Sequence, residues 1–174
     1  MKKMFTLVCI VMVVTLLAGT TARAEIPVKP MEKAIVDTLA LLPHYGVFDS
    51  LSFQLDGNSV ILLGQVMLPI TKDEAGKRVA KISGVGNVIN RLEVLPLSPG
   101  DDRIRLAVYR RLFSTADLYR YALGARPSIH IIVKDGHLSL EGVVSTESDS
   151  NLALMAAKQV TGIFSVKNNL RIEK

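Results

Sequence analysis

The side chains best suited to binding a ligand are arginines and tyrosines concentrated in residues 103–126. This stretch holds six arginines against a single acid, Asp117, and three of the four tyrosines in the chain. Guanidinium groups bind phosphates through forked hydrogen bonds, and tyrosines favour the headgroup zone of a bilayer. We therefore expect this segment to contact anionic phospholipid headgroups. The candidate lipid-binding residues are Arg103, Arg105, Tyr109, Arg110, Arg111, Tyr119, Arg120 and Tyr121.

A helix over residues 102–113 would carry most of these side chains. Its apolar stripe, at helical spacing, consists of Ile104, Val108 and Leu112. Arg103 and Arg110 are seven residues apart and share another face, whereas Arg105 lies nearer the apolar side. A second interpretation stays open, in which the arginines form a solvated basic face and the aromatic residues belong to the core.

The histidines and the single cysteine do not indicate catalysis. His130 and His137 fall on the outer face of one predicted hairpin, but pairing puts them opposite Glu141 and Lys134, too far apart to converge on a metal. No Ser–His–acid spacing and no phosphate-binding glycine loop is present. We therefore predict a protein that is not an enzyme and holds no metal and no cofactor.

The first 24 residues have the pattern of a secretory signal peptide. Two lysines precede an apolar run that contains Cys9, and Ala22-Arg23-Ala24 forms a small-x-small cleavage site. Thr20 stands where a lipoprotein would have its acylated cysteine, so we expect a periplasmic chain without a lipid anchor. Loss of the leader would lower the formal charge from +5 to +2, which weakens a nucleic-acid interpretation.

The remainder of the chain is an internal repeat. Residues 52–95 and 130–173 align at a constant offset of 78 with no gap. The matched pairs include Gly64 with Gly142, Gly84 with Gly162 and Asn90 with Asn168. An internal repeat of this length indicates two small modules in place of one larger domain.

Each copy reads helix, strand, strand, helix, strand. In the first copy the later elements are expected at 52–56, 59–66, 70–83 and 86–95. Gly57-Asn58 and Asp135-Gly136 are two-residue hairpin tips. A right-handed crossover makes the last strand parallel to the second. The predicted fold is α+β, with a three-stranded mixed sheet covered by two helices in each module. The expected boundaries are 1–24 for the signal peptide, 30–95 for module 1, 96–101 for the linker and 102–174 for module 2.

This order of elements resembles the BON domain of exported bacterial envelope proteins. The residues that carry the resemblance are the hairpin tips, Gly64 and Gly142, and the segments Gly84-Val85 to Asn90 and Gly162-Ile163 to Asn168. The tandem arrangement is similar to osmotically inducible periplasmic members and to lipoproteins of that family, although the acylated cysteine is missing here. The resemblance implies a non-enzymatic module that binds phospholipid surfaces or envelope partners, with lipid binding assigned to the second copy.

The two copies differ on the outer face of the sheet. In copy one this face carries the apolar residues Ile61, Leu63, Ile89 and Leu95. In copy two the equivalents are Ser139, Glu141, Lys167 and Glu173. An apolar outer face indicates a covered surface, so these four are candidate interface residues for docking between the modules, self-association, a partner protein or a membrane. Copy two also has about nine extra residues before its hairpin. The alternative function is thus protein interaction or a chaperone-like role in envelope stress, through module 1.

Overall fold

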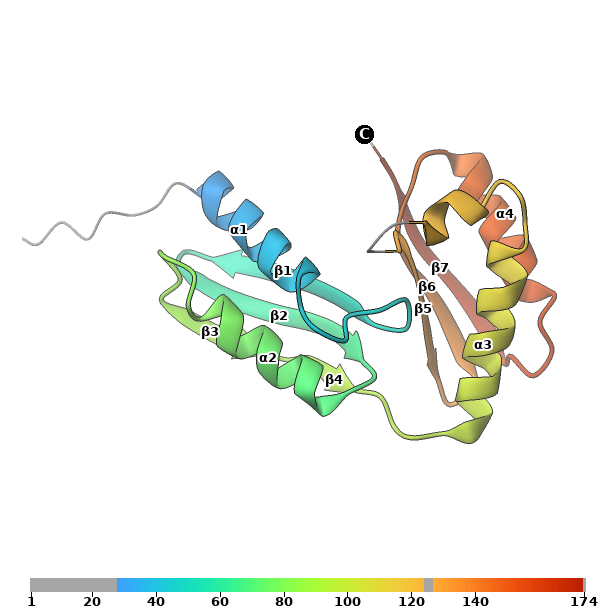
Figure 1. Ribbon diagram of the computed structural model, residues 1–174, viewed down its shortest axis with the longest axis horizontal. Coiled ribbons are helices and arrows are strands. Elements are labelled where there is room, and N and C mark those ends of the chain that lie inside the picture. The colour runs from blue at the N-terminus through green and yellow to red at the C-terminus, as the bar shows by residue number, and fades with distance from the viewer. Residues whose placement is uncertain (1–27, 124–126, 174) are drawn as a thin grey trace, which may run out of the picture.

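The computed structural model describes residues 28–123 and 127–173, which form two α+β modules joined end to end (Figure 1). The predicted signal peptide lies outside the described residues, as does Arg126 of the basic segment. Among the described residues, no helix has the length and apolar content needed to cross a membrane.

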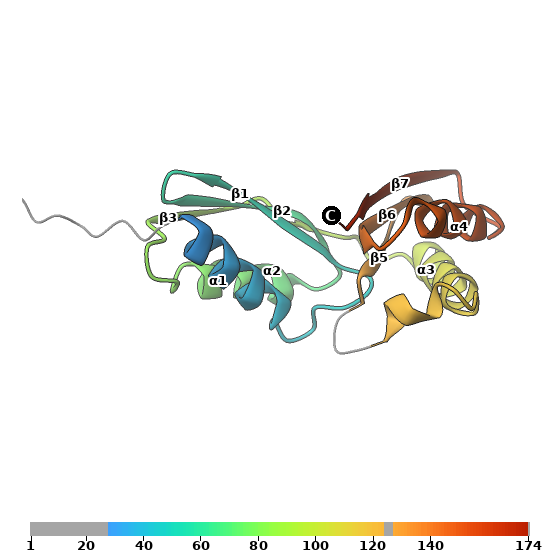
Figure 2. The ribbon, with the colours of Figure 1, turned by 90° about the horizontal axis from the view of Figure 1, so that it is seen from above.

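Module 1 places two helices on one face of a mixed sheet (Figures 1 and 2). Its elements are α1 (Val28–Ala40), β1 (Ser50–Asp56), β2 (Ser59–Val66), α2 (Pro69–Val79), β3 (Asn87–Asn90) and β4 (Glu93–Val94). Strand β1 is antiparallel to β2, and the two short strands β3 and β4 are both parallel to β2. The core between helices and sheet contains Met31, Ile35, Leu39, Val60, Leu62, Ala75, Val79 and Leu92.

Module 2 repeats this arrangement. Its elements are α3 (Pro99–Phe113), the 3-10 helix η1 (Tyr119–Ala122), β5 (Ile129–Lys134), β6 (His137–Val144), α4 (Glu147–Lys158) and β7 (Ser165–Ile172). The strand order is β5-β6-β7, with β6 antiparallel to β5 and parallel to β7. The predicted α+β architecture of two modules, each with a mixed sheet and two helices, is therefore confirmed. The sheet of module 1 has four strands in place of the predicted three, because the strand expected at 86–95 is divided into β3 and β4.

Residues shared by the copies account for local geometry. Gly64 and Gly142 have φ of 122° and 116°, and a Cβ on either would come within 2.0 Å of the carbonyl oxygen of Ser50 or Ser128 on the neighbouring strand. Only glycine fits such an approach. These glycines lie inside β2 and β6.

The shared asparagines join the last strand to the second helix. In module 2, Asn168 donates through Nδ2 to the carbonyl oxygen of Ser150 (3.2 Å) and accepts through Oδ1 from the backbone N–H of Leu170. Asn90 does the same in module 1, with Lys72 and Leu92 as its partners. The equivalent pairs, related by the offset of 78, confirm that the repeat reflects common architecture.

Some helix limits differ from the sequence expectation. Helix α3 begins at Pro99, because Ser98 accepts a hydrogen bond from the Asp101 backbone N–H (3.2 Å) and Pro99 suits the first turn. Helix α2 ends at Val79, and short i to i+3 turns follow it. Gly84, with φ of 92°, therefore lies in the loop beyond the helix.

Candidate lipid-binding and interface surfaces

Helix α3 presents a basic face to solvent. Arg103, Leu106, Arg110 and Arg111 are all exposed, and Leu106 is 46% exposed. Arg103, Leu106 and Arg110 are spaced three, four and seven residues apart, so they lie on one side of the helix, away from the buried Val108 and Leu112, and Arg111 adjoins them. We call Arg103, Leu106, Arg110 and Arg111 the α3 basic face. Arg111 donates to Gln159 Oε1, so the face continues towards the end of α4.

Arg105 lies on the opposite side of the helix and is only 1% exposed. Its two terminal nitrogens bond the Val133 carbonyl oxygen on β5 (2.5 Å) and Asp102 Oδ1 (2.5 Å). The sequence interpretation let this side chain reach solvent, but the guanidinium is instead held between α3 and β5. Its role in this geometry is structural, and it is unavailable to a ligand at the surface.

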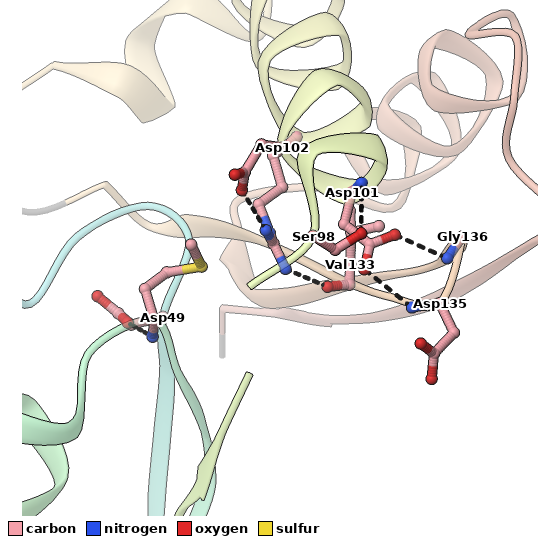
Figure 3. A network of polar contacts seen from close by, with 9 residues as sticks. Asp49, Ser98, Asp101, Asp102, Val133, Asp135 and Gly136 are labelled. Atoms are coloured by element: carbon pink, nitrogen blue, oxygen red, sulfur yellow. Dashed lines mark hydrogen bonds and ion pairs between the residues drawn. The ribbon is translucent and has the colours of Figure 1, made fainter. Parts of the chain in front are cut away.

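The start of α3 is tied to the hairpin tip of module 2 (Figure 3). The buried carboxylate of Asp101 accepts hydrogen bonds from the backbone N–H groups of Asp135 (3.0 Å) and Gly136 (2.9 Å). Asp135 and Gly136 both have positive φ, at 52° and 75°, as a type I′ turn requires. The orientation of the α3 basic face is thus fixed by buried polar contacts at one end.

Tyr121 and Arg120 belong to a second network, at the start of α4. The Tyr121 hydroxyl donates to Asp149 Oδ2 (2.9 Å) and accepts from the Ser145 backbone N–H (2.9 Å), while Arg120 pairs with the same carboxylate at 2.7 Å. Hydrogen bonds from Thr146 and Tyr121, together with the Arg120 charge, lower the pKa of Asp149. Tyr121 is 7% exposed, so it anchors η1 and does not face a ligand.

The other two candidate tyrosines have different surroundings. Tyr109 is 39% exposed and makes edge contacts with the rings of Phe113 (5.0 Å) and Phe48 (6.2 Å between centroids). Because Phe48 belongs to module 1, Tyr109 takes part in the contact between the modules. Tyr119 is 54% exposed. The eight predicted residues therefore fall into two groups. Four of them are exposed and make no buried contact: Arg103, Arg110, Arg111 and Tyr119.

The candidate interface residues of module 1 also differ in exposure. Ile61 and Ile89 are register partners on β2 and β3, and Ile89 is 38% exposed. Leu63 is half-buried. Leu95 is 3% exposed, with its backbone N–H bonded to the Val66 carbonyl oxygen. The apolar outer face therefore consists of Ile61, Leu63 and Ile89, and Leu95 is not part of it.

The modules contact each other mainly through residues 41–49, the connector between α1 and β1. The Val47 carbonyl oxygen accepts from the Ile131 backbone N–H at 2.8 Å, which extends the pairing at the free edge of β5. Val47 and Phe48 pack against the core of module 2. In both ribbon views the connector reaches β5 (Figures 1 and 2). One signal in the sequence could have indicated this: Ile132 lies on the outer face of β5 and is 2% exposed.

His130 sits at the centre of this contact and is 9% exposed. Its Nδ1 lies 3.2 Å from the Gly46 carbonyl oxygen, and its Nε2 lies 3.3 Å from the Tyr45 hydroxyl oxygen. Burial lowers the pKa of His130, although the Gly46 hydrogen bond and the Asp49 charge oppose this effect. Burial also raises the pKa of Asp49, which accepts hydrogen bonds from the Met67 and Gly46 backbone N–H groups.

An ion pair adds to the contact at the other end of the sheet. Lys134 Nζ lies 2.5 Å from Glu93 Oε1, and Gln65 donates to the other oxygen of the same carboxylate. The hydrogen bond from Lys134 is the largest cause that lowers the pKa of Glu93. Both side chains are more than 40% exposed, so the pair orients the modules more than it stabilises them.

A metal site is not evident in the part of the chain that the structure describes. No group of three histidine, aspartate, glutamate or cysteine side chains there is arranged to hold a metal ion. His137 bonds Ser165 Oγ at 2.7 Å, while His130 faces module 1, so the two histidines of the hairpin serve different contacts.

The repeated fold and the shared glycines define a known class of module, and the chain belongs to the BON domain family. The family model matches residues 54–96 and 100–174. The chain is similar to Osmotically-inducible protein Y of Escherichia coli (strain K12), with 30% identity over 138 residues that cover 76% of this chain and 67% of that protein.

Two solved structures from Chlamydia trachomatis are also similar. Both are of CdsD, a structural protein of the type III secretion system, and one is described as its C-terminal domain. They share 14% and 13% identity with this chain, cover 82% and 83% of it, and represent 96% and 94% of their own chains. The TM-scores are 0.34 and 0.33. Similarity at this level supports no argument about arrangement or function.

Proposed function

We propose that this is an exported, non-enzymatic protein of the periplasm that binds anionic phospholipid surfaces through the α3 basic face. The observation that carries the proposal is the placement of three exposed arginines around an exposed leucine on one side of α3. A membrane surface attracts such a side through charge, and the leucine can enter the boundary between headgroups and acyl chains.

The strength of this attraction follows from the charges involved. Each Lys or Arg near an anionic surface contributes about 1 kcal/mol. Neutralising Arg110 and Arg111 would therefore weaken binding by about 2 kcal/mol, roughly 30-fold, and reversing their charge would weaken it further. Neither guanidinium has a carboxylate partner among the described residues, so the change breaks no ion pair there.

The test is co-sedimentation with vesicles that contain anionic lipid, at low and high salt. Arg110→Glu with Arg111→Glu should abolish binding and leave the thermal unfolding profile unchanged, and binding by the unaltered protein should fall as salt screens the charges. The matched control is Lys77→Glu with Lys81→Glu, an equal charge change on and just after α2 of module 1. Full binding by the arginine variant, or equal loss in the lysine control, would show that the α3 basic face is not the site.

A second candidate function rests on the outer face of module 1. Ile61 and Ile89 lie side by side in register on adjacent strands, and Leu63 continues the apolar surface. This surface suits self-association or a partner protein. Ile61→Ser with Leu63→Ser should shift the oligomeric state seen by solution scattering, and an unchanged profile would rule out a self-association interface.

A further inference from the structure

Module 1 contains an open groove beside its edge strand β1. At the equivalent place in module 2, beside β5, lie Val47 and Phe48 of the connector. The groove lies between α1 and the edge strand β1, and has a volume of about 490 Å³. Its apolar lining includes Val36, Leu39, Leu51, Phe53 and Leu55. The backbone of α3 lies close to β5 in module 2, whereas the backbone of α1 approaches β1 less closely in module 1.

The repeat permits a comparison of the same positions in both modules. Leu51, Phe53 and Leu55 are only partly buried in module 1. At the offset of 78 their equivalents are Ile129, Ile131 and Val133, and each of these is 0% exposed. The residues that complete the burial in module 2 are Val47 and Phe48 of the connector together with Leu118 and Tyr121 around η1. In module 1 the connector contributes Leu42 and Tyr45 to the core, and Leu51, Phe53 and Leu55 nevertheless stay partly buried.

The backbone at the strand edge differs in the same way. The Ile131 N–H of β5 donates to the Val47 carbonyl oxygen at 2.8 Å. Phe53 occupies the equivalent position on β1, which among the described residues pairs with β2 only. An unpaired strand edge beside an apolar groove is a template for an added strand. Arg171 of module 2 lines the groove and also the cavity beside His130, so the groove is continuous with the contact between the modules.

We propose that the α1/β1 groove binds an extended apolar segment of another protein, which adds to the edge of β1 as Val47 and Phe48 add to β5. The segment supplies a carbonyl oxygen to the Phe53 N–H and two apolar side chains to the space between α1 and β1. The exposed guanidinium of Arg171 favours an acidic residue in the segment. This binding site is separate from the α3 basic face and does not depend on lipid binding.

The probe is a labelled peptide with the sequence of residues 44–50 of this chain, added to the purified full chain. Binding should be saturable and should slow hydrogen exchange at the Phe53 amide. The Ile131 amide should not change, because the tethered connector outcompetes a free peptide at micromolar concentration. A peptide with serine in place of both Val47 and Phe48 is the matched control, and it should lose at least tenfold in affinity.

A variant of the protein tests the groove directly. Val36 is 51% exposed, so Val36→Arg places a charge in the groove without disturbing the core, and should weaken the peptide at least tenfold. Leu41→Arg, at a 65% exposed position outside the groove, should bind normally. The proposal is overturned if the peptide fails to protect the Phe53 amide. It is also overturned if sodium dodecanoate alone occupies the groove, because the site would then be a pocket for acyl chains.

Discussion

Replacing His130 with phenylalanine should weaken the contact between the modules. The His130 ring stacks on Tyr45 with 5.3 Å between centroids. Because a carbonyl oxygen can only accept, Nδ1 donates to Gly46, and the neutral ring accepts from the Tyr45 hydroxyl at Nε2. Phenylalanine keeps the size and stacking of the ring and removes both hydrogen bonds, so the substitution isolates their contribution.

The expected loss of stability follows from the removal of two neutral hydrogen bonds at a largely buried position. Each contributes about 0.5–1.5 kcal/mol, so the variant should lose about 1–3 kcal/mol. With an m-value of about 2 kcal/mol/M, the urea midpoint of module 2 would fall by about 0.5–1.5 M. His137→Phe is the matched control: His137 is exposed on the same hairpin, and its replacement should change stability by less than about 0.5 kcal/mol.

The effect should also depend on pH. Because burial lowers the pKa of His130, the unfolded chain binds more protons between that lowered pKa and the ordinary value near 6.5. Stability therefore falls as the pH drops from 7.5 into this window. The raised pKa of Asp49 changes stability in the opposite direction, because protonation at lower pH removes the cost of burying its charge. Glu141 and Arg171 line the cavity beside His130, so their charges also act on its ring.

Urea unfolding at pH 7.5, 6.5 and 5.5 separates these contributions, because the phenylalanine variant retains Asp49 and lacks only the histidine. The difference in stability between the two proteins should be largest at pH 7.5 and should narrow towards pH 5.5. Solution scattering should show a more open arrangement of the modules in the variant. If both proteins show the same dependence on pH, or equal stability at pH 7.5, His130 does not hold the modules together.

Two further substitutions test the buried framework of module 2. Arg105→Met keeps the aliphatic stem and removes the charged hydrogen bond to the Val133 carbonyl oxygen. It should lower the free energy of unfolding, measured in urea, by about 1.5–3 kcal/mol. An unchanged urea midpoint would show that the bond is dispensable. Gly142→Ala would bring a Cβ within 2.0 Å of the Ser128 carbonyl oxygen. It should therefore lower the free energy of unfolding by more than about 2 kcal/mol. A thermal midpoint equal to that of the unaltered protein would contradict the strand geometry.

The repeat made the fold predictable from the sequence. A residue present at both positions of the offset is constrained by the module itself, as Asn90 and Asn168 show through their equivalent helix contacts. The same reasoning identified both hairpin tips, because Gly57 and Gly136 supply the positive φ of two-residue turns. Helix ends were less predictable, because the α3 start depends on one side-chain cap, from Ser98.

The candidate site was predictable only in part. Periodicity places Arg103 and Arg110 on one face, and the structure agrees. Periodicity cannot show that Arg105 reaches a carbonyl oxygen 28 residues away, because that bond depends on the packing of α3 on β5. The role of the connector was also missed, since Val47 and Phe48 fall in a segment without regular structure. Their only indication was the apolar Ile132 on a face where a polar residue was expected.

The contact between the modules accounts for the difference in burial between the two copies. A module of about 70 residues buries little apolar surface, so its stability alone is marginal. Module 2 gains a cover over the edge of β5 from the connector, and the burial of Ile129 and Ile131 is complete as a result. Module 1 provides that cover, and the connector residues that pack on its own core, Leu42 and Tyr45, leave the groove beside its edge strand β1 open. The asymmetry predicts that module 1 is the less protected partner, and that a bound segment at β1 would stabilise it just as the connector stabilises module 2.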